Sequence, residues 1–126
     1  MADRANHRVQ IYDGEGRYKR CVGENFLTSP SVFDLDGDRM IVGELNARIA
    51  VLDRDDTLIG FLGDGSELVQ KPGWPNRRDA DGNPMRPDDL VPGILNSPHG
   101  MAVDTDGSIY ISEWLIGGRY TKLQRY

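Results

Sequence analysis

The fold is decided by a stretch that occurs twice, first as Ser31-Val32-Phe33-Asp34-Leu35-Asp36-Gly37-Asp38-Arg39-Met40-Ile41-Val42-Gly43-Glu44 and again as Gly100-Met101-Ala102-Val103-Asp104-Thr105-Asp106-Gly107-Ser108-Ile109-Tyr110-Ile111-Ser112-Glu113. Each copy reads as a short strand, an Asp-x-Asp-Gly turn, a second apolar strand and a closing acidic residue. Asp-Gly between alternating apolar runs favours a hairpin, because a type I′ turn needs positive φ at both central residues. The chain therefore contains an internal repeat of β-hairpins.

A second unit recurs between these hairpins. Residues 3–13 match residues 44–53, and each segment has an acidic residue, a short polar loop, an arginine, an alternating strand and an Asp-headed turn. The step from Asp13 to Asp53 is 40 residues, a common length for a four-stranded propeller blade. The pattern predicts strands near residues 8–13, 17–23, 31–34, 39–44, 48–53, 57–62, 100–104, 108–113 and 119–124. We therefore expect an all-β protein of about two propeller blades per chain.

The predicted organisation has four parts. Residues 1–27 form the outer hairpin of one blade, residues 28–63 a complete blade, and residues 97–126 a last, incomplete blade. Residues 64–96 form a Pro/Gly-rich insertion, which is either a tolerated surface loop or a lid or binding loop. Trp74 and Met85, as the largest apolar side chains there, are expected to pin the insertion to the sheets.

Composition narrows the function classes. A net charge of −5 and a pI near 4.9 argue against nucleic-acid binding, which needs clustered Lys and Arg. No apolar run approaches the ~20 residues that span a bilayer, and no signal region follows Met1, so we expect a soluble, by default cytoplasmic, protein without membrane partners. The lone Cys21 cannot form an internal disulfide, and we expect it to be a small half-buried side chain.

The repeats, with Asp3 through Ile11, resemble the NHL-repeat family of six-bladed β-propellers. The segment from Ser97-Pro98-His99-Gly100 to Leu123 is similar to the last blade of bacterial propellers related to peptidyl-α-hydroxyglycine α-amidating lyase. In that lyase family, histidines at the start of innermost strands bind an axial zinc ion, and the resemblance puts His99 at such a position. Counting back from the Asp-x-Asp-Gly turn, the equivalent position in the other hairpin is Ser29, which does not bind zinc.

The resemblance leaves two function classes open. The segment with the family's catalytic arginine has no match here. Its catalytic tyrosine would fall in the loop after the second strand, where this chain has residues 4–6 (Arg-Ala-Asn) and 45–47 (Leu-Asn-Ala). These departures favour a non-catalytic propeller module that scaffolds or binds a ligand. The alternative is a zinc-dependent lyase-like enzyme assembled from several chains.

The strand count predicts self-association. Nine expected strands make two blades and one spare strand, and open sheet edges invite pairing. The first hairpin lacks an inner partner and the last blade lacks its outermost strand, so neighbouring copies could complete each other head to tail. A homotrimer would close a six-bladed ring and bring three copies of His99 around the axis. The chain could instead be a C-terminal piece of a longer propeller.

Three further groups of residues have structural and functional interpretations. The acidic runs at 34–38, 79–82 and 104–107 are better explained as turns than as calcium loops. The acidic and arginine pairs Asp3–Arg8, Glu44–Arg48 and Glu113–Arg119 recur in each unit, so structural ion pairs are more plausible than catalytic groups. We expect His7 to be exposed, and Tyr110 and Trp114 to be core aromatics rather than a ligand platform.

Overall fold

The computed structural model describes residues 1–125 as three antiparallel sheets and one small hairpin. The first sheet contains β1 (Ala2–Asp3), β2 (Arg8–Tyr12) and β3 (Tyr18–Val22), with the 3-10 helix η1 (Arg4–Asn6) between β1 and β2. The middle sheet contains β4 (Pro30–Asp36), β5 (Arg39–Glu44), β6 (Arg48–Leu52) and β7 (Leu58–Leu62). The last sheet contains β10 (Pro98–Val103), β11 (Ile109–Glu113) and β12 (Arg119–Leu123).

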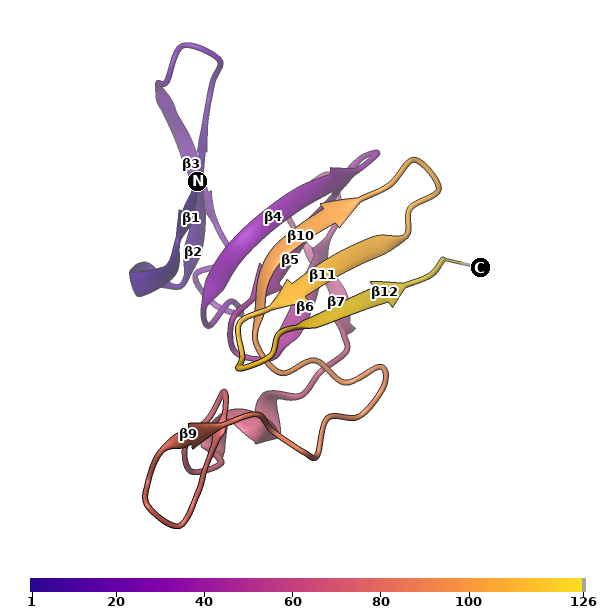
Figure 1. The fold of residues 1–126 in the computed structure, drawn as a ribbon. Coiled ribbons are helices and arrows are strands. Elements are labelled where there is room, and N and C mark those ends of the chain that lie inside the picture. Colours follow the sequence, from indigo (N-terminus) through magenta and orange to yellow (C-terminus); the bar gives the residue numbers. More distant parts are fainter. Residues whose placement is uncertain (126) are drawn as a thin grey trace.

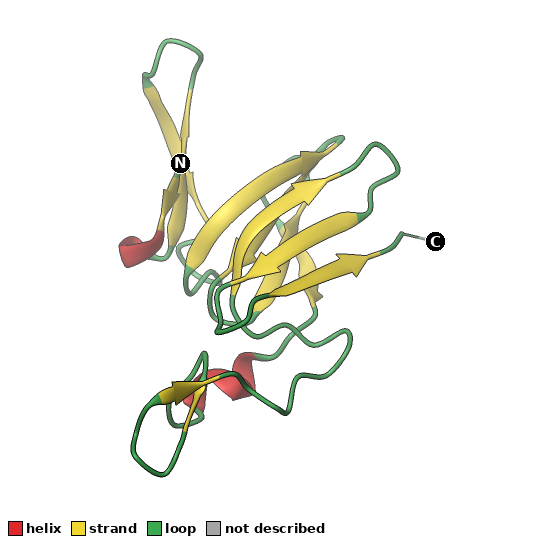
Figure 2. Cartoon of the chain, viewed as in Figure 1, coloured by secondary structure: helices red, strands yellow, loops and turns green. Residues whose placement is uncertain are grey.

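The sheets lie one behind another along the chain, each built from strands in sequence order (Figures 1 and 2). The all-β prediction is confirmed, and every expected strand is present within a few residues of its predicted bounds. The expectation that the opening hairpin has no inner partner is wrong, because β1 pairs with β2 through Asp3 and Arg8. Residues 1–125 do not close into a barrel or a ring by themselves.

Two apolar cores lie between the sheets. The first core joins the first and middle sheets and consists of Val9, Val22, Leu27, Val42, Ala50 and Leu52, with Ile11, Phe26, Met40, Leu58 and Phe61 packed around them. The second core joins the middle and last sheets and consists of Ile41, Ile49, Leu95, Ile109 and Ile111, with Val51, Met101, Val103 and Leu123 around them. The middle sheet is therefore covered on both faces, whereas the two end sheets are each covered on one.

The two Asp-x-Asp-Gly turns differ in length, although their sequences align. Asp36 pairs directly with Arg39, and of the two residues between them Gly37 has φ 57° while Asp38 is not in the positive region. This is the φ pattern of a type II′ turn rather than the expected type I′. The turn at Asp104 is longer, and its carboxylate accepts the amides of Asp106 (3.0 Å) and Ser108 (2.9 Å). The acidic residues at this turn therefore organise the backbone, as predicted.

The insertion folds against the ends of the sheets. It contains the 3-10 helix η2 (Ser66–Gln70) and the hairpin β8 (Arg77–Arg78) and β9 (Pro84–Met85). Trp74 is half-buried and its Nε1 donates to the carbonyl of Asn96 (3.2 Å), as expected for a residue that pins the segment. The same expectation for Met85 is wrong, because Met85 is exposed on the small hairpin and pairs with Arg77. Leu95, fully buried in the second core, anchors the segment instead.

None of the helices formed by residues 1–125 is long and apolar enough to cross a membrane.

Candidate functional site

A carboxylate and an arginine occupy the same cross-strand pair in all three sheets and give a common reference for comparing them. The pairs are Asp3 with Arg8, Glu44 with Arg48 and Glu113 with Arg119. In every case the arginine Nε donates to the carboxylate, over 2.9 Å in the first sheet and 2.7 Å in the middle sheet. The sheets can therefore be superposed residue by residue from these pairs outward.

Glu44 shows what the pair does in the complete sheet. Its side chain is fully buried, and one oxygen accepts the amide and hydroxyl of Thr28 and the amide of Ser29. Arg48 passes across the other oxygen and donates to the carbonyl of Phe26 (2.8 Å). The pair thus ties the loop that enters β4 to the turn between β5 and β6, which supports the structural interpretation.

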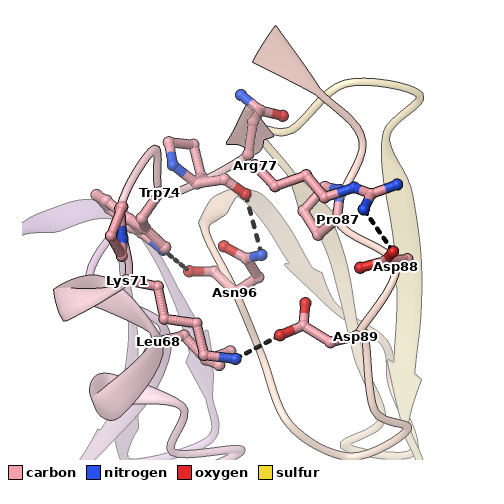
Figure 3. Close-up of a pocket in the computed structure, with 11 residues that line it drawn as sticks. Leu68, Lys71, Trp74, Arg77, Pro87, Asp88, Asp89 and Asn96 are labelled. Carbon is pink, nitrogen blue, oxygen red and sulfur yellow. Dashed lines mark hydrogen bonds and ion pairs between the residues drawn. The ribbon is translucent and has the colours of Figure 1, made fainter. Parts of the chain in front are cut away.

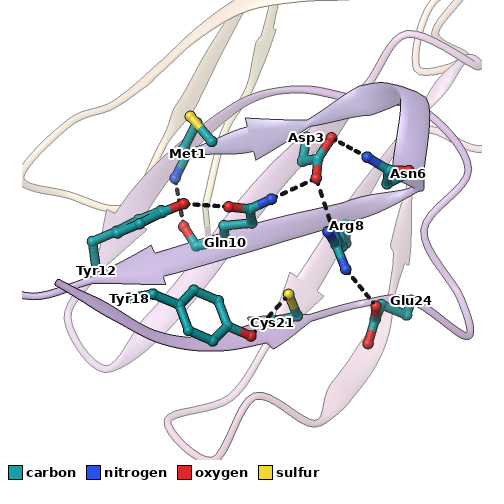
Figure 4. Close-up of polar contacts among 9 residues, drawn as sticks. All are labelled: Met1, Asp3, Asn6, Arg8, Gln10, Tyr12, Tyr18, Cys21 and Glu24. Carbon is teal, nitrogen blue, oxygen red and sulfur yellow. Dashed lines mark hydrogen bonds and ion pairs between the residues drawn. The ribbon is translucent and has the colours of Figure 1, made fainter. Parts of the chain in front are cut away.

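Glu113 repeats this arrangement in the last sheet by accepting the amides of Asn96 (2.5 Å) and Ser97 (3.2 Å). Asp3 differs, because within residues 1–125 it lies on the first strand of its sheet, β1. Asp3 instead accepts side-chain amides from Asn6 (2.8 Å) and Gln10 (2.6 Å), as Figure 4 shows. The hydrogen bond from Arg8 is the main reason that the pKa of Asp3 lies below its usual range.

The outward face of the last sheet is the first candidate site, and we call it the last open face. The register places Tyr110, Tyr120 and Lys122 where the middle sheet has the core residues Ile41, Ile49 and Val51. With Gly100, Ala102 and Ser112 they line a shallow groove of about 420 Å³. The prediction that Tyr110 and Trp114 are core aromatics is wrong for this chain, because they are 43% and 60% exposed.

The last open face is amphipathic rather than apolar. Tyr120 is 90% exposed, and the Lys122 ammonium lies 5.1 Å from the centre of the Tyr110 ring. The Tyr110 hydroxyl raises the pKa of Lys122 and donates to the carboxylate of Asp104 (3.1 Å). These contacts give the polar ends of Tyr110 and Lys122 partners on the same face and leave their apolar parts available for packing.

The outward face of the first sheet is the matching surface at the other end of the stack, and we call it the first open face. Figure 4 shows the residues of this face, which are Gln10, Tyr12, Tyr18 and Cys21. By register they occupy the positions at which the middle sheet has the core residues Ala50, Leu52, Leu58 and Phe61. The rings of Tyr12 and Tyr18 meet edge to face at 5.9 Å. The Tyr18 hydroxyl donates to the sulfur of Cys21 (3.2 Å), and Cys21 is half-buried as predicted.

His99 lies at the inner edge of the last open face. It is exposed, sits at a register shift between Pro98 and Gly100, and its ring centre is 6.3 Å from that of Trp114. In the middle sheet the same irregularity falls between Pro30 and Val32, so its equivalent is Ser31. The alignment of His99 with Ser29 is therefore wrong by two residues, because the turns used for counting have different lengths.

Ser31 indicates the role of this bulge position. Its hydroxyl lies 3.0 Å from the carbonyl oxygen of Gly43 and 2.8 Å from that of Pro98, so it bridges the middle and last sheets. His99 occupies the same place on the last sheet and faces the side on which another sheet would stack. A side chain there can bind either a neighbouring sheet or a group on the inner edge of the stack.

Within residues 1–125 no three His, Cys, Asp or Glu side chains converge on a point where a metal ion could bind. His7 is exposed, as predicted, with its Nδ1 against the carbonyl of Thr28. At the acidic run 79–82 the Asp79 carboxylate accepts the amides of Asp81 (2.9 Å) and Asn83 (2.8 Å), which is the hydrogen bonding of a turn. The hydrogen bond from the Asn83 amide is the main cause that lowers the pKa of Asp79.

The insertion encloses a second cavity of about 250 Å³ beside Trp74 (Figure 3). Two ion pairs frame it, Lys71 with Asp89 and Arg77 with Asp88. The buried Asn96 lies among these residues, and its Nδ2 donates to the carbonyl of Pro75 (3.1 Å). Its Oδ1 has no hydrogen-bond partner among the residues that the structure describes. No local sequence pattern singles out Asn96, because its burial depends on the path of the whole insertion.

Comparison with known proteins adds no family to these observations, since neither a scan against models of protein families nor a search of curated proteins found a match.

Proposed function

We propose that this chain is a set of NHL-type β-propeller blades that self-associates into a closed ring and acts as a non-catalytic scaffold or ligand-binding module. The observation that carries the proposal is the pair of open faces. Each keeps the strand positions of an inter-sheet core, but tyrosine, glutamine, cysteine and lysine replace its apolar residues. These are side chains that a sheet can bury in an interface and also expose in a single chain.

The two open faces are of different kinds, which determines how copies can meet. The last open face corresponds to the side of the middle sheet that packs on the last sheet. The first open face corresponds to the side of the middle sheet that packs on the first sheet. A last open face therefore matches the first open face of another copy, and not a second last open face. Such contacts are head to tail and close into a ring when the rotation allows.

The strand positions bear on the number of copies. A trimer with two blades per chain requires the first sheet of one copy to merge with the last sheet of the next. Both sheets already hold strands at the second and third positions, β1 and β2 in the first sheet and β11 and β12 in the last. Merging would displace one of these two pairs, whereas face-to-face stacking displaces neither. If the ring has six blades, as the resemblance implies, two chains of three sheets supply them, so we favour a dimer over the trimer.

A metal on the ring axis remains part of the proposal through His99. Each copy would contribute one exposed imidazole from the inner edge of its last sheet. A dimer thus supplies two of the three or four protein ligands that zinc usually has, and other groups must complete the site. Neutral imidazole on a rigid strand is a suitable zinc ligand. The loops at residues 4–6 and 45–47 carry no tyrosine, so we propose no lyase reaction at such a site.

The proposal is tested by measuring the mass of the purified chain by native mass spectrometry and light scattering over a range of concentrations. We expect a defined oligomer that Tyr120→Asp dissociates. Tyr12→Asp, on the opposite open face, should dissociate it equally, because each head-to-tail contact uses both faces. Mixing the two variants should restore one contact and give open dimers but no larger species.

Ile59→Asp is the matched control, because Ile59 is 57% exposed but lies on β7, away from both open faces. This variant should keep the mass of the unmodified chain. A chain that stays monomeric at all concentrations would rule out the ring. An oligomer that survives both tyrosine substitutions would place the contact elsewhere on the molecule.

A further inference from the structure

A groove beside the outer edge of the last sheet is a second, separate feature of the stack. It has a volume of about 310 Å³ and runs between the middle and last sheets, with an apolar floor formed by Ile41, Val51, Leu62, Ile109 and Leu123. Four of these five residues belong to the second core. The groove is thus the outer continuation of an interface that already holds two sheets together.

The first core shows what fills this place when a sheet is complete. The floor residues Val51, Leu62 and Leu123 correspond by register to Ile11, Val22 and Leu52. In the first core these three pack in one cluster with Leu58 and Phe61, which β7 brings to the outer edge of the middle sheet. The last sheet ends at β12 within the described residues, so no fourth strand brings equivalent side chains to its groove.

The exposed fractions of two equivalent residues, Val22 and Leu62, show the difference between an interface with a fourth strand and one without it. Val22, which packs in one cluster with Leu58 and Phe61 of β7, is 4% exposed. Leu62 holds the equivalent position in the next interface and is 40% exposed. Both residues end the outermost strand of their own sheet, so the covering strand accounts for the contrast. Along the groove, β12 also presents one side of its backbone that no strand of residues 1–125 pairs with, and such an edge pairs readily with an extended segment.

We propose that this groove and the free edge of β12 together bind one extended segment of a partner protein, which adds to the last sheet as its fourth strand. Main-chain hydrogen bonds to β12 would supply affinity, and apolar side chains entering the groove would supply specificity. The strand that fills the equivalent place, β7, defines the chemistry of the occupant. The bound segment should carry apolar residues at the positions equivalent to Leu58 and Phe61. Between them it should carry a small residue, at the position equivalent to Gly60.

The far end of the groove limits the length of the segment. Arg125 crosses from the end of β12 to the carboxylate of Asp36 (3.1 Å). This ion pair closes the groove where the turn from a third to a fourth strand would begin. A segment of about five residues, the length of β7, spans the open part. The proposal concerns the sheet edge and not the open faces, so it does not depend on ring formation.

A synthetic peptide with the sequence of residues 56–63 is the probe, titrated into the full-length isotope-labelled chain and followed by NMR. We expect saturable binding with shifts at Thr121, Leu123 and Leu62, and slower hydrogen exchange of β12 amides. A peptide with serine in place of the residues equivalent to Leu58 and Phe61 should bind at least about tenfold more weakly, because it loses the groove contacts. A peptide with serine in place of Ile59, which is exposed on β7, should bind as before.

The protein side is tested with Leu62→Lys, a change at a half-exposed position that should leave the fold intact. We expect at least about a tenfold loss of affinity for the unmodified peptide. Absence of saturable binding up to about 1 mM would overturn the proposal. Equal binding of the doubly serine-substituted peptide would overturn it as well, and so would shifts centred on the open faces. The oligomeric mass is read separately, so a failed ring and a failed groove give different results.

Discussion

Replacing Glu44 by glutamine should be among the most destabilising isosteric changes in this chain. Glu44 is fully buried, with three donors on one oxygen and Arg48 on the other. A glutamine amide must turn its NH2 group either toward the backbone amides of Thr28 and Ser29 or toward the guanidinium. In both orientations donors face donors, and buried groups lose their partners.

The size of the effect follows from those lost contacts. Hydrogen bonds to a charged group contribute about 1.5–3 kcal/mol each, and a buried donor left unpaired costs about 1–3 kcal/mol. We therefore expect Glu44→Gln to lower the free energy of unfolding by about 3 kcal/mol, a large part of the 5–15 kcal/mol of a typical domain. With a urea dependence of about 2 kcal/mol per molar, the midpoint should fall by about 1.5 M.

Urea unfolding at fixed protein concentration, followed by Trp fluorescence and circular dichroism, measures the change. Asp3→Asn is the matched variant, because Asp3 holds the same pair in the first sheet but accepts the side-chain amides of Asn6 and Gln10 in place of backbone amides. Its midpoint should move much less. Equal shifts for the two variants would refute the role given to the buried amides of Thr28 and Ser29.

Two further predictions concern acid stability and the axial site. The pKa of Asp104 is lowered, mainly by the hydrogen bond from the Ser108 backbone amide. The contribution of this carboxylate to stability is therefore present above the ordinary pKa of aspartate and is lost as the pH falls through the lowered pKa. Asp104→Asn should therefore flatten the decline of unfolding midpoints between about pH 5 and pH 2, and curves that stay parallel would contradict this. For the proposed axial zinc site, metal analysis of the oligomer after zinc addition and desalting should find bound zinc. The His99→Ala variant should lose this zinc and the His7→Ala variant should keep it. Zinc retained by His99→Ala would place the site elsewhere.

The strands could be predicted because their signal is local. Alternation of apolar and polar residues, bounded by Asp-headed turns, marks each long strand without reference to the rest of the chain. Strand β1 escaped prediction because a two-residue strand carries no alternation. The recurring carboxylate and arginine were visible for a different reason, since both members of each pair lie within a few residues in the sequence.

The site residues depend on register, which sequence spacing does not determine. Counting residues back from the turns aligned His99 with Ser29. The sequence does not show that the turn after Asp36 has two central residues whereas the turn at Asp104 is longer, so the count was displaced by two residues. Size alone selected Met85 as an anchor, whereas its short hairpin leaves it in solvent and Leu95 does the anchoring. Exposure of Tyr110 could not be predicted either, since the same alternation occurs on a covered sheet and on an open one.

The composition of the open faces indicates how strongly copies of the chain would bind to each other in the proposed assembly. An interface of isoleucine and valine, like that on the middle sheet, would leave a single chain with a large apolar patch and make association obligatory. The last open face carries Tyr110, Tyr120 and Lys122 in those places, so a separated chain keeps hydroxyl and ammonium groups in water. Burying the rings still removes apolar area from water, but the polar tips must find partners in the contact. Association through these faces should therefore be reversible and depend on concentration, with folded single chains at high dilution.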